Sequence, residues 1–231
     1  MAPRRPALDR ERIVAAAVRV ADRTGGQVSM RSVGKELGVE AMSLYHHVDD
    51  KEALLDALAD WIFTGIELPA PGAPWRAAME LRATSARSVL SQHPWALGLI
   101  ESRRTPGPAL LAHHEAVLAC LRGDGFSVAL AAHTFSTLDS YVYGFVLTEL
   151  NLPMDSGESI ETFVDEIREL VPADEYPHLT EMITEQVVGR DYAYGDEFEF
   201  GLGLILDGVQ RHLDSDGPTD QVLHSGDERH P

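Results

Sequence analysis

Apolar residues recur along most of the chain at the three- and four-residue spacing of an amphipathic α-helix. The pattern predicts a first helix that extends to about Thr24. Its apolar face consists of Ile13, Ala16, Ala17 and Val20. Asp9 is suited to cap its N-terminus, because a short polar side chain can accept from the free backbone N–H groups. Gly25-Gly26 ends it, since glycine adopts the left-handed C-cap conformation at little cost.

Two short helices follow. Ser29 can cap the second, which Gly38 ends, and the third is predicted over about residues 40–47. A small core against the first helix is predicted from Val33, Leu37, Val39, Leu44 and Val48.

A longer fourth helix is capped by Asp49 or Asp50, and Asp49-x-x-Glu52 has the capping-box pattern. Its apolar residues are Leu54, Leu55, Leu58, Ile62 and Ile66. The segment LPAPGAP (68–74) contains three prolines, which cannot continue a helix. We therefore expect a domain boundary there.

Beyond this break the periodicity again favours helices, and no convincing alternating strand is present. They are predicted at about 75–91, 95–102, 108–122, 127–151, 159–170, 178–189 and 196–213. The chain is therefore predicted to be all-α. We divide it into a head (1–50), a connecting fourth helix (51–67), a helical body (68–213) and a polar tail (214–231) expected to be disordered.

Charge separates the head from the rest. The net charge is −18, yet residues 1–51 hold nine Lys/Arg against seven Asp/Glu. An acidic body with a slightly basic head suggests that only the head meets a polyanion. No apolar run is long enough to span a membrane, and no secretory signal is evident. Together with a single cysteine, Cys120, this favours a cytoplasmic protein.

Two short helices joined at residues 37–39 match a helix-turn-helix. The turn needs a residue that tolerates a positive φ, and Gly38 supplies it. The third helix would then present an outer face that fits the major groove of DNA. The side chains on that face or its flanks are those of Ala41, Met42, Ser43, Tyr45, His46 and His47.

The stretch VSMRSVGKELGVEAMSLYHHVDDKEALLDAL resembles the DNA-binding domain of TetR-type transcriptional regulators, over roughly residues 8–60. The resemblance implies that Arg31 contacts a base or phosphate and that residues 41–43 read base edges. It also implies that residues 45–47 contact the backbone and nearby bases, and that Lys51 binds phosphate. Ala41 replaces the base-reading amide of the tetracycline repressors, which implies a different operator with more contact to thymine methyls.

Residues 75–152 resemble, more loosely, the second domain of the tetracycline repressors, which binds a small ligand and dimerises. The resemblance implies a homodimeric repressor released from a palindromic DNA operator by a small-molecule effector. The predicted pocket residues are Trp95, Leu99, His113, Val117, Phe135, Thr137, Leu138, Tyr141 and Phe145. The dimer interface is predicted between helices 127–151 and 196–213, with Val142, Phe198, Leu202, Ile205 and Val209.

The body departs from the tetracycline repressors where they hold their magnesium–drug chelate. Glu101 matches their first metal-binding histidine, while Ser140 and Thr148 match the downstream His and Glu. Arg82 and Ala86 match an amide and a phenylalanine. Tetracycline is therefore not the expected effector.

Neither a metal nor a cofactor is predicted. The pairs His46-His47 and His113-His114 point about 100° apart on a helix, whereas zinc on a helix needs an i, i+4 pair. His93 and His133 are isolated. A helical hydrolase is a rival reading, but the chain lacks a nucleophile elbow and H-E-x-x-H. A second rival is a DNA-bound regulator switched by a protein, or an activator.

The resemblance also implies a mechanism, in which the fourth helix acts as a lever. Lys51 would touch phosphate at one end, and residues 61–66 would pack on the body at the other. Ligand binding would shift this helix and move the two heads out of register with successive major grooves. A coupling of about 1–3 kcal/mol would lower operator affinity about 5- to 150-fold.

Overall fold

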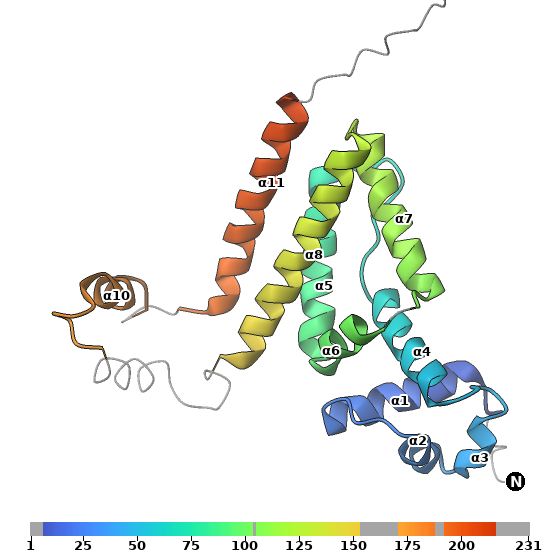
Figure 1. Ribbon diagram of the computed structural model, residues 1–231. Coiled ribbons are helices and arrows are strands. Elements are labelled where there is room, and N and C mark those ends of the chain that lie inside the picture. The colour runs from blue at the N-terminus through green and yellow to red at the C-terminus, as the bar shows by residue number, and fades with distance from the viewer. Residues whose placement is uncertain (1–6, 104, 153–170, 188–191, 216–231) are drawn as a thin grey trace, which may run out of the picture.

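The computed structural model describes residues 7–103, 105–152, 171–187 and 192–215 of the 231-residue chain. Within these ranges every regular element is helical, which confirms the all-α prediction. Figure 1 shows a small helical head at one end, a larger helical body beyond it, and α4 passing from one to the other.

The head contains α1 (Arg10–Thr24), α2 (Met30–Leu37), α3 (Ala41–Leu44) and the start of α4 (Lys51–Thr64). The body contains α5 (Trp75–Gln92), α6 (Trp95–Ser102), α7 (Pro108–Gly123), α8 (Val128–Asn151) and α11 (Glu197–Ser215). Before α11 come α10 (Pro177–Met182), a π-helical turn (Ile183–Val187) and a 3-10 turn (Tyr194–Asp196). Figure 1 places α10 to one side of α8 and α11.

Two hydrophobic cores stabilise the chain, and α4 contributes to both. Leu54 and Leu58 are fully buried in the head core with residues of α1, α2 and α3. Ile62 and Phe63 belong to the body core. The side chain of Trp61 packs against both cores. A movement of α4 therefore disturbs head and body together, because its two halves are each close-packed.

Three predicted boundaries differ from the structure. The cap of α4 is Asp50, whose carboxylate accepts from Ala53 N at 2.8 Å, so the capping box at Asp49 is wrong. The third helix is a single turn, Ala41–Leu44, rather than 40–47. The helix predicted at 178–189 changes to a π-helical turn at Ile183.

The helix predicted at 159–170 lies outside the described residues, as does most of the tail. The first two residues of that predicted tail, 214 and 215, still belong to α11.

Candidate DNA interface and ligand-responsive site

The geometry of the helix-turn-helix depends on local capping and on two glycines. Ser29 Oγ accepts from Ser32 N at 3.1 Å, and Ser32 Oγ accepts from Ser29 N at 3.0 Å. Gly38 ends α2 with φ 69°, as predicted from the sequence. Gly34 was not singled out, yet a Cβ there would lie 2.9 Å from the carbonyl oxygen of Val39. Both glycines therefore let α3 follow α2 so closely.

The side chains predicted to contact DNA differ in their exposure. Met42 is 72% exposed and Tyr45 43% exposed, both unusually high values for large apolar or aromatic side chains. Arg31, His46, His47 and Lys51 are also exposed, whereas Ala41 and Ser43 are half-buried. Leu44 and Val48, which alternate with them, are buried in the head core. The burial of Leu44 and Val48 thus fixes the position of the exposed residues next to them in sequence.

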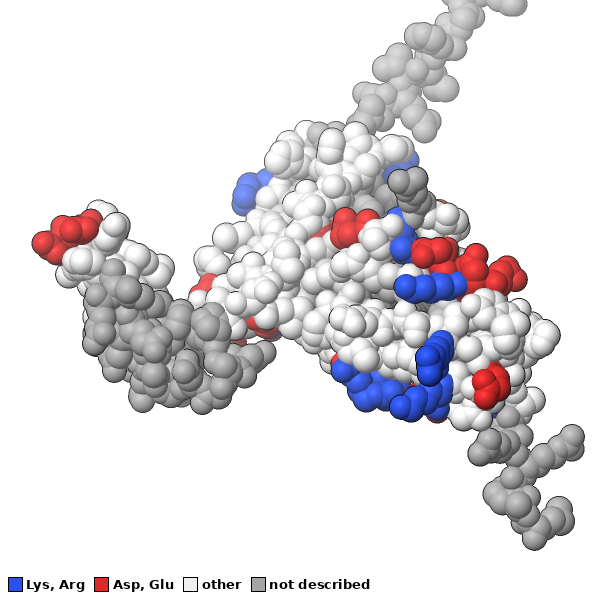
Figure 2. Space-filling view, turned by 60° about the horizontal axis from the view of Figure 1, so that its bottom comes forward, with Lys and Arg blue, Asp and Glu red and all other residues white. Residues whose placement is uncertain are grey.

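Some basic side chains of the head form ion pairs and others do not. Arg19 and Arg23 both bind Glu36, at 2.9 and 2.6 Å, and the pKa of that carboxyl is lowered by these two hydrogen bonds. Arg31, Lys35 and Lys51 are exposed and form no ion pair within the described part of the chain. Figure 2, turned toward the head end, shows blue side chains gathered on its lower face and red ones along another edge. Cations without an ion-pair partner suit phosphate contact.

The head is fixed to the body at the end of α1. Asp22 Oδ1 accepts from Trp95 Nε1 at 2.7 Å and lies 2.8 Å from His93 Nδ1. The His93 ring in turn packs edge-on against Trp61 of α4, with 5.2 Å between ring centroids. Gly26 follows α1 with φ 87°, and a Cβ there would lie 2.9 Å from Trp95 Cβ. The junction between α5 and α6 therefore contacts α1 and α4 at once.

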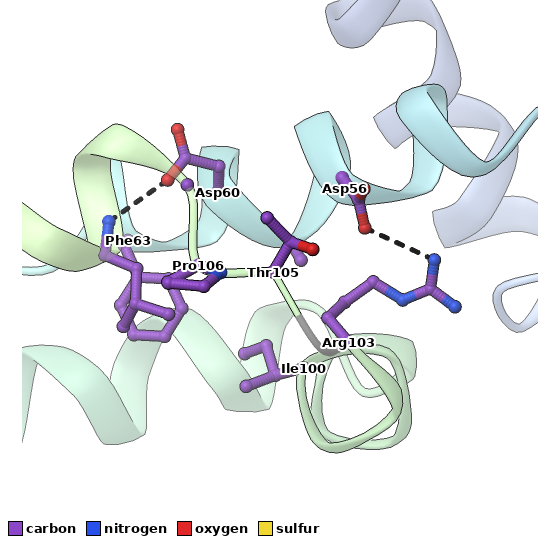
Figure 3. A pocket seen from close by; sticks show the side chains of 10 residues that line it. Asp56, Asp60, Phe63, Ile100, Arg103, Thr105 and Pro106 are labelled. Carbon is purple, nitrogen blue, oxygen red and sulfur yellow. Dashed lines mark hydrogen bonds and ion pairs between the residues drawn. The ribbon is translucent and has the colours of Figure 1, made fainter. Parts of the chain in front are cut away.

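One side of α4 carries three acidic residues spaced by four, Glu52, Asp56 and Asp60, which share a helix face. Arg103, directly after α6, donates to Glu52 at 2.8 Å and to Asp56 at 3.4 Å. Figure 3 shows the Asp56–Arg103 contact beside the loop that leads to α7. The hydrogen bond that Arg103 donates to Glu52 is the largest cause of the raised pKa of Arg103.

Asp60 extends this contact to α7. Its Oδ1 accepts from the backbone N–H groups of Ala109 and Leu110, at 2.8 and 3.0 Å, and so caps the N-terminus of α7 from a different helix. Gly107 makes this possible, because a Cβ at that position would lie 2.3 Å from Asp60 Oδ1. A carboxylate at a helix N-terminus is favoured by both the free N–H groups and the helix dipole. This interhelical cap was not predicted from the sequence.

A cavity of about 180 Å³ lies between α4, the end of α6 and the start of α7. Figure 3 shows Asp56 and Asp60 of α4 above, Ile100 and Arg103 below, and the loop with Thr105 and Pro106 between them, beside Phe63. The remaining lining residues are Ala59, Gly107 and Leu110. Its wall therefore includes the contacts that join α4 to α6 and α7.

A buried polar cluster lies deeper in the body, around Arg82 of α5. Arg82 Nε donates to His113 Nε2 at 2.7 Å, and its Nη2 donates to Asp139 at 2.5 Å. Its guanidinium lies over the Phe135 ring, 5.4 Å from the centroid. Arg82 is 3% exposed and His113 is fully buried. Burial, followed by the Arg82 charge, lowers the pKa of His113 to about 3, so this imidazole stays neutral.

The residues predicted to line a pocket do not lie around a single cavity. His113 belongs to the cluster around Arg82, and Phe135 covers it. Val117 and Leu138 are fully buried in the body core, while Thr137 is exposed. Trp95 and Leu99 pack against the head core, and Trp95 also packs against the body core. Tyr141 and Phe145 face α11, since both rings lie near Phe198.

The residues predicted for a dimer interface divide by burial. Val142, Phe198 and Leu202 are buried inside the protomer, and Ile205 and Val209 are half-buried. Tyr141 Oη donates to Phe198 O at 2.9 Å, which Gly201 permits, because a Cβ there would lie 2.4 Å from that hydroxyl. On α11 the exposed apolar residues are Phe200 and Leu204, at 67% and 58%. The sequence pattern could not separate the face of α11 that packs on α8 from the face that remains exposed.

The described residues contain no group of three or more His, Cys, Asp or Glu side chains placed to hold a metal ion. Across the same part of the chain, none of the helices has the length and apolar character needed to cross a membrane.

An exposed helix-turn-helix joined by a shared helix to a separate helical body defines a class of two-domain DNA-binding regulators. Comparison with known proteins gives the family. Residues 13–58 match the model of bacterial regulatory proteins of the tetR family, and residues 68–213 match the tetracyclin repressor-like C-terminal domain. The chain belongs to the TetR family and is a transcriptional regulator, not an enzyme.

Several relatives extend along most of the chain. The HTH-type transcriptional repressor DrrR1 of Streptomyces coeruleorubidus is 32% identical over 216 residues, covering 89% of this chain and 78% of its own. The class D tetracycline repressor protein of Escherichia coli is 28% identical, covering 80% and 95%. The structure of the Streptomyces coelicolor TetR family protein ActR with actinorhodin matches with a TM-score of 0.71 and 26% identity, covering 90% and 99%.

Proposed function

We propose that this protein is a cytoplasmic repressor that occupies a two-fold DNA operator as a homodimer and leaves it when a small molecule binds the body. The observation that carries the proposal is the double role of α4. Its first half lies in the core of the DNA-reading head, and its acidic face holds α6 and α7 around a cavity. Relatives named as repressors, and one solved with actinorhodin bound, support a ligand-controlled function.

For the head, we propose that Arg31 and residues 41–43, 45–47 and 51 contact DNA. Met42 and Tyr45 are exposed at the position of the recognition helix, where apolar contact can distinguish thymine. Lys51, the first residue of α4, adds a cation beside free helix N–H groups, a combination that favours phosphate. We propose that the chain is divided by function into the DNA-binding head (1–50), the connecting helix (51–67), the ligand-binding and dimerising body (68–213) and the polar tail (214–231).

For the body, we propose that a ligand entering the cavity of α4, α6 and α7 strains the contacts of Arg103 and Asp60. Because these contacts lie on α4, their loss releases the helix that carries the head. The ligand needs to favour the released arrangement by only about 1–3 kcal/mol to lower operator affinity about 5- to 150-fold.

We propose that two protomers associate through the exposed faces of α8 and α11. Leu147, Phe200 and Leu204 are large apolar residues left exposed there, while the previously predicted Val142 and Phe198 are already buried. Only side chains that are exposed in the protomer can bury further apolar surface area against a partner. The apolar residues Tyr176, Leu179 and Met182, exposed on and beside α10, offer further contact area.

The dimer is tested by sedimentation of the variants Leu204→Glu and Leu111→Glu. Both replace an exposed apolar residue, but Leu204 lies on α11 in the proposed interface, whereas Leu111 lies on α7. Leu204→Glu is expected to sediment as a monomer and lose cooperative operator binding, and Leu111→Glu to remain dimeric. A dimeric Leu204→Glu protein would exclude this interface.

The repressor function is tested by selecting DNA from a random pool with the purified protein and measuring binding by fluorescence anisotropy. The selected site should be a palindrome whose half-site centres lie about one helical turn or a multiple of it apart. A library of aromatic natural-product-like molecules is then titrated into the complex, and at least one compound should release the DNA. If the regulator is switched by a protein, no compound should release the DNA. If it is an activator, deleting the gene of the regulator should reduce transcription of the genes that it controls.

A further inference from the structure

The strongest unexplained feature of the body is a group of buried polar atoms without hydrogen-bond partners. Among the described residues these are Arg82 Nη1, His113 Nδ1 and Thr134 Oγ1. They come from α5, α7 and α8, which pack together in the body. An unsatisfied buried polar atom destabilises the folded protein, and more strongly when it is charged. Three of them in one domain call for an explanation.

The tautomer of His113 follows from its partner. An arginine side chain can only donate, so His113 Nε2 must accept the hydrogen bond from Arg82 Nε. A neutral imidazole has one proton, which is then on Nδ1. The neutral state agrees with the low pKa of His113, which burial and the Arg82 charge cause. His113 Nδ1 is therefore a buried donor without an acceptor.

Arg82 has the same excess of donors. Its Nε and Nη2 are used by His113 and Asp139, which leaves the two N–H bonds of Nη1 unpaired. Asp139 balances the charge of Arg82 without reaching Nη1. The cluster thus has two nitrogen groups that can donate and no acceptor for either of them among the described residues.

Phe63 connects this cluster with the cavity. Its side chain lines the cavity beside Asp60, and its ring packs edge-on against His113, with 5.6 Å between centroids. The cavity of about 180 Å³ is smaller than the ~300–1,000 Å³ of sites for drug-sized ligands. A ligand of that size requires a lining side chain to move, and Phe63 is the lining residue whose ring contacts His113.

We propose that the effector is an aromatic molecule with an acceptor oxygen, a carboxylate or phenolate, that binds Arg82 Nη1 and His113 Nδ1. The inference rests on the proposed ligand-released function and assigns the chemistry of its ligand. The aromatic part occupies the cavity beside Ile100 and Leu110, and the anionic oxygen replaces Phe63 against His113. Because Phe63 belongs to α4, occupation of the donor pair displaces the helix that carries the head.

The test uses three matched probes: a naphthalene carboxylate, its neutral carboxamide and the corresponding naphthylmethyl ammonium. Binding to the wild-type dimer is measured by calorimetry without DNA. The carboxylate should bind best, with a preference of about 10- to 100-fold over the ammonium, which brings only further donors. Equal binding of the three probes, preference for the ammonium, or no binding of the carboxylate would overturn the proposal.

Variants of the buried cluster test which residues cause the preference for the carboxylate probe. Arg82→Gln/Asp139→Asn removes both charges together, so that no buried charge is left unpaired. His113→Phe removes the second donor, and His113→Asn returns an N–H near the Nδ1 position. The first two should lose most of the carboxylate preference, and His113→Asn should regain part of it. The control Arg87→Gln/Glu149→Gln removes another ion pair between α5 and α8 and should keep the preference. Equal loss in control and test variants contradicts the assignment.

Operator release is measured separately with the same probes. A carboxylate that binds through Arg82 without releasing DNA supports the site and contradicts the proposed function. A neutral compound that releases DNA, while the carboxylate does not bind, supports the function and contradicts the site.

Discussion

The cap that Asp60 provides to α7 allows a sharp test of how the body controls the head. Asp60→Ala removes the carboxylate oxygen that accepts from the backbone N–H groups of Ala109 and Leu110. In the native protein these two hydrogen bonds are 2.8 and 3.0 Å long. Loss of such a cap costs about 0.5–2 kcal/mol. For a protein of this size each kcal/mol lowers Tm by about 2–4 °C. If docking of α4 on α7 holds the head in its DNA-binding position, operator affinity falls about 5-fold for 1 kcal/mol and about 30-fold for 2 kcal/mol.

The chain offers a matched control. Asp124 Oδ2 accepts from Trp75 N at 2.7 Å and so caps α5 from the end of α7, entirely within the body. Asp124→Ala should lower Tm by a similar amount but leave operator affinity unchanged. Gly107→Ala should behave like Asp60→Ala, because its Cβ would lie 2.3 Å from Asp60 Oδ1. Anisotropy titrations with labelled operator measure the affinities, and calorimetry measures Tm.

Equal losses of operator affinity in Asp60→Ala and Asp124→Ala would refute this reasoning, since the effect would then be general destabilisation. Unchanged affinity in Asp60→Ala, with the expected fall in Tm, would show that the contact stabilises the body without positioning the head.

Three further predictions concern the head, the lever and pH. Lys51→Ala should weaken operator binding similarly for all sequences and reduce the slope of log affinity against log salt by about 1, measured by anisotropy over a salt series. Trp61→Ala, which removes a side chain packed on both cores, should preserve ligand binding but reduce ligand-induced DNA release; full release in this variant contradicts the lever. The pKa of His113 is lowered to about 3 from 6.5, so between these values the unfolded chain binds a proton that the folded chain does not. Stability should therefore rise with pH in this range and be lost as pH falls through it, and His113→Asn should flatten the slope of Tm against pH.

The sequence determined most of the head because its signals are local. Ser29 caps α2 and Gly38 ends it at a positive φ, as the residue types require. The alternation of buried Leu44 and Val48 with exposed neighbours followed from helical spacing alone. The choice of Asp50 over Asp49 as the cap of α4 could not be made, because adjacent aspartates carry the same propensity and the path of the chain selects between them.

Only the tertiary structure decided the contacts between segments distant in sequence. Asp60 lies 49 residues from the N–H group of Ala109 that it caps, and Arg82 lies 31 residues from His113. Nothing in the spacing of these residues indicates a partner, since the pairing depends on how α4, α5 and α7 cross. The same reason applies to the orientation of α11. The sequence pattern identified Phe198 as part of an apolar helix face, but only packing against α8 buries Phe198 and leaves Phe200 and Leu204 exposed.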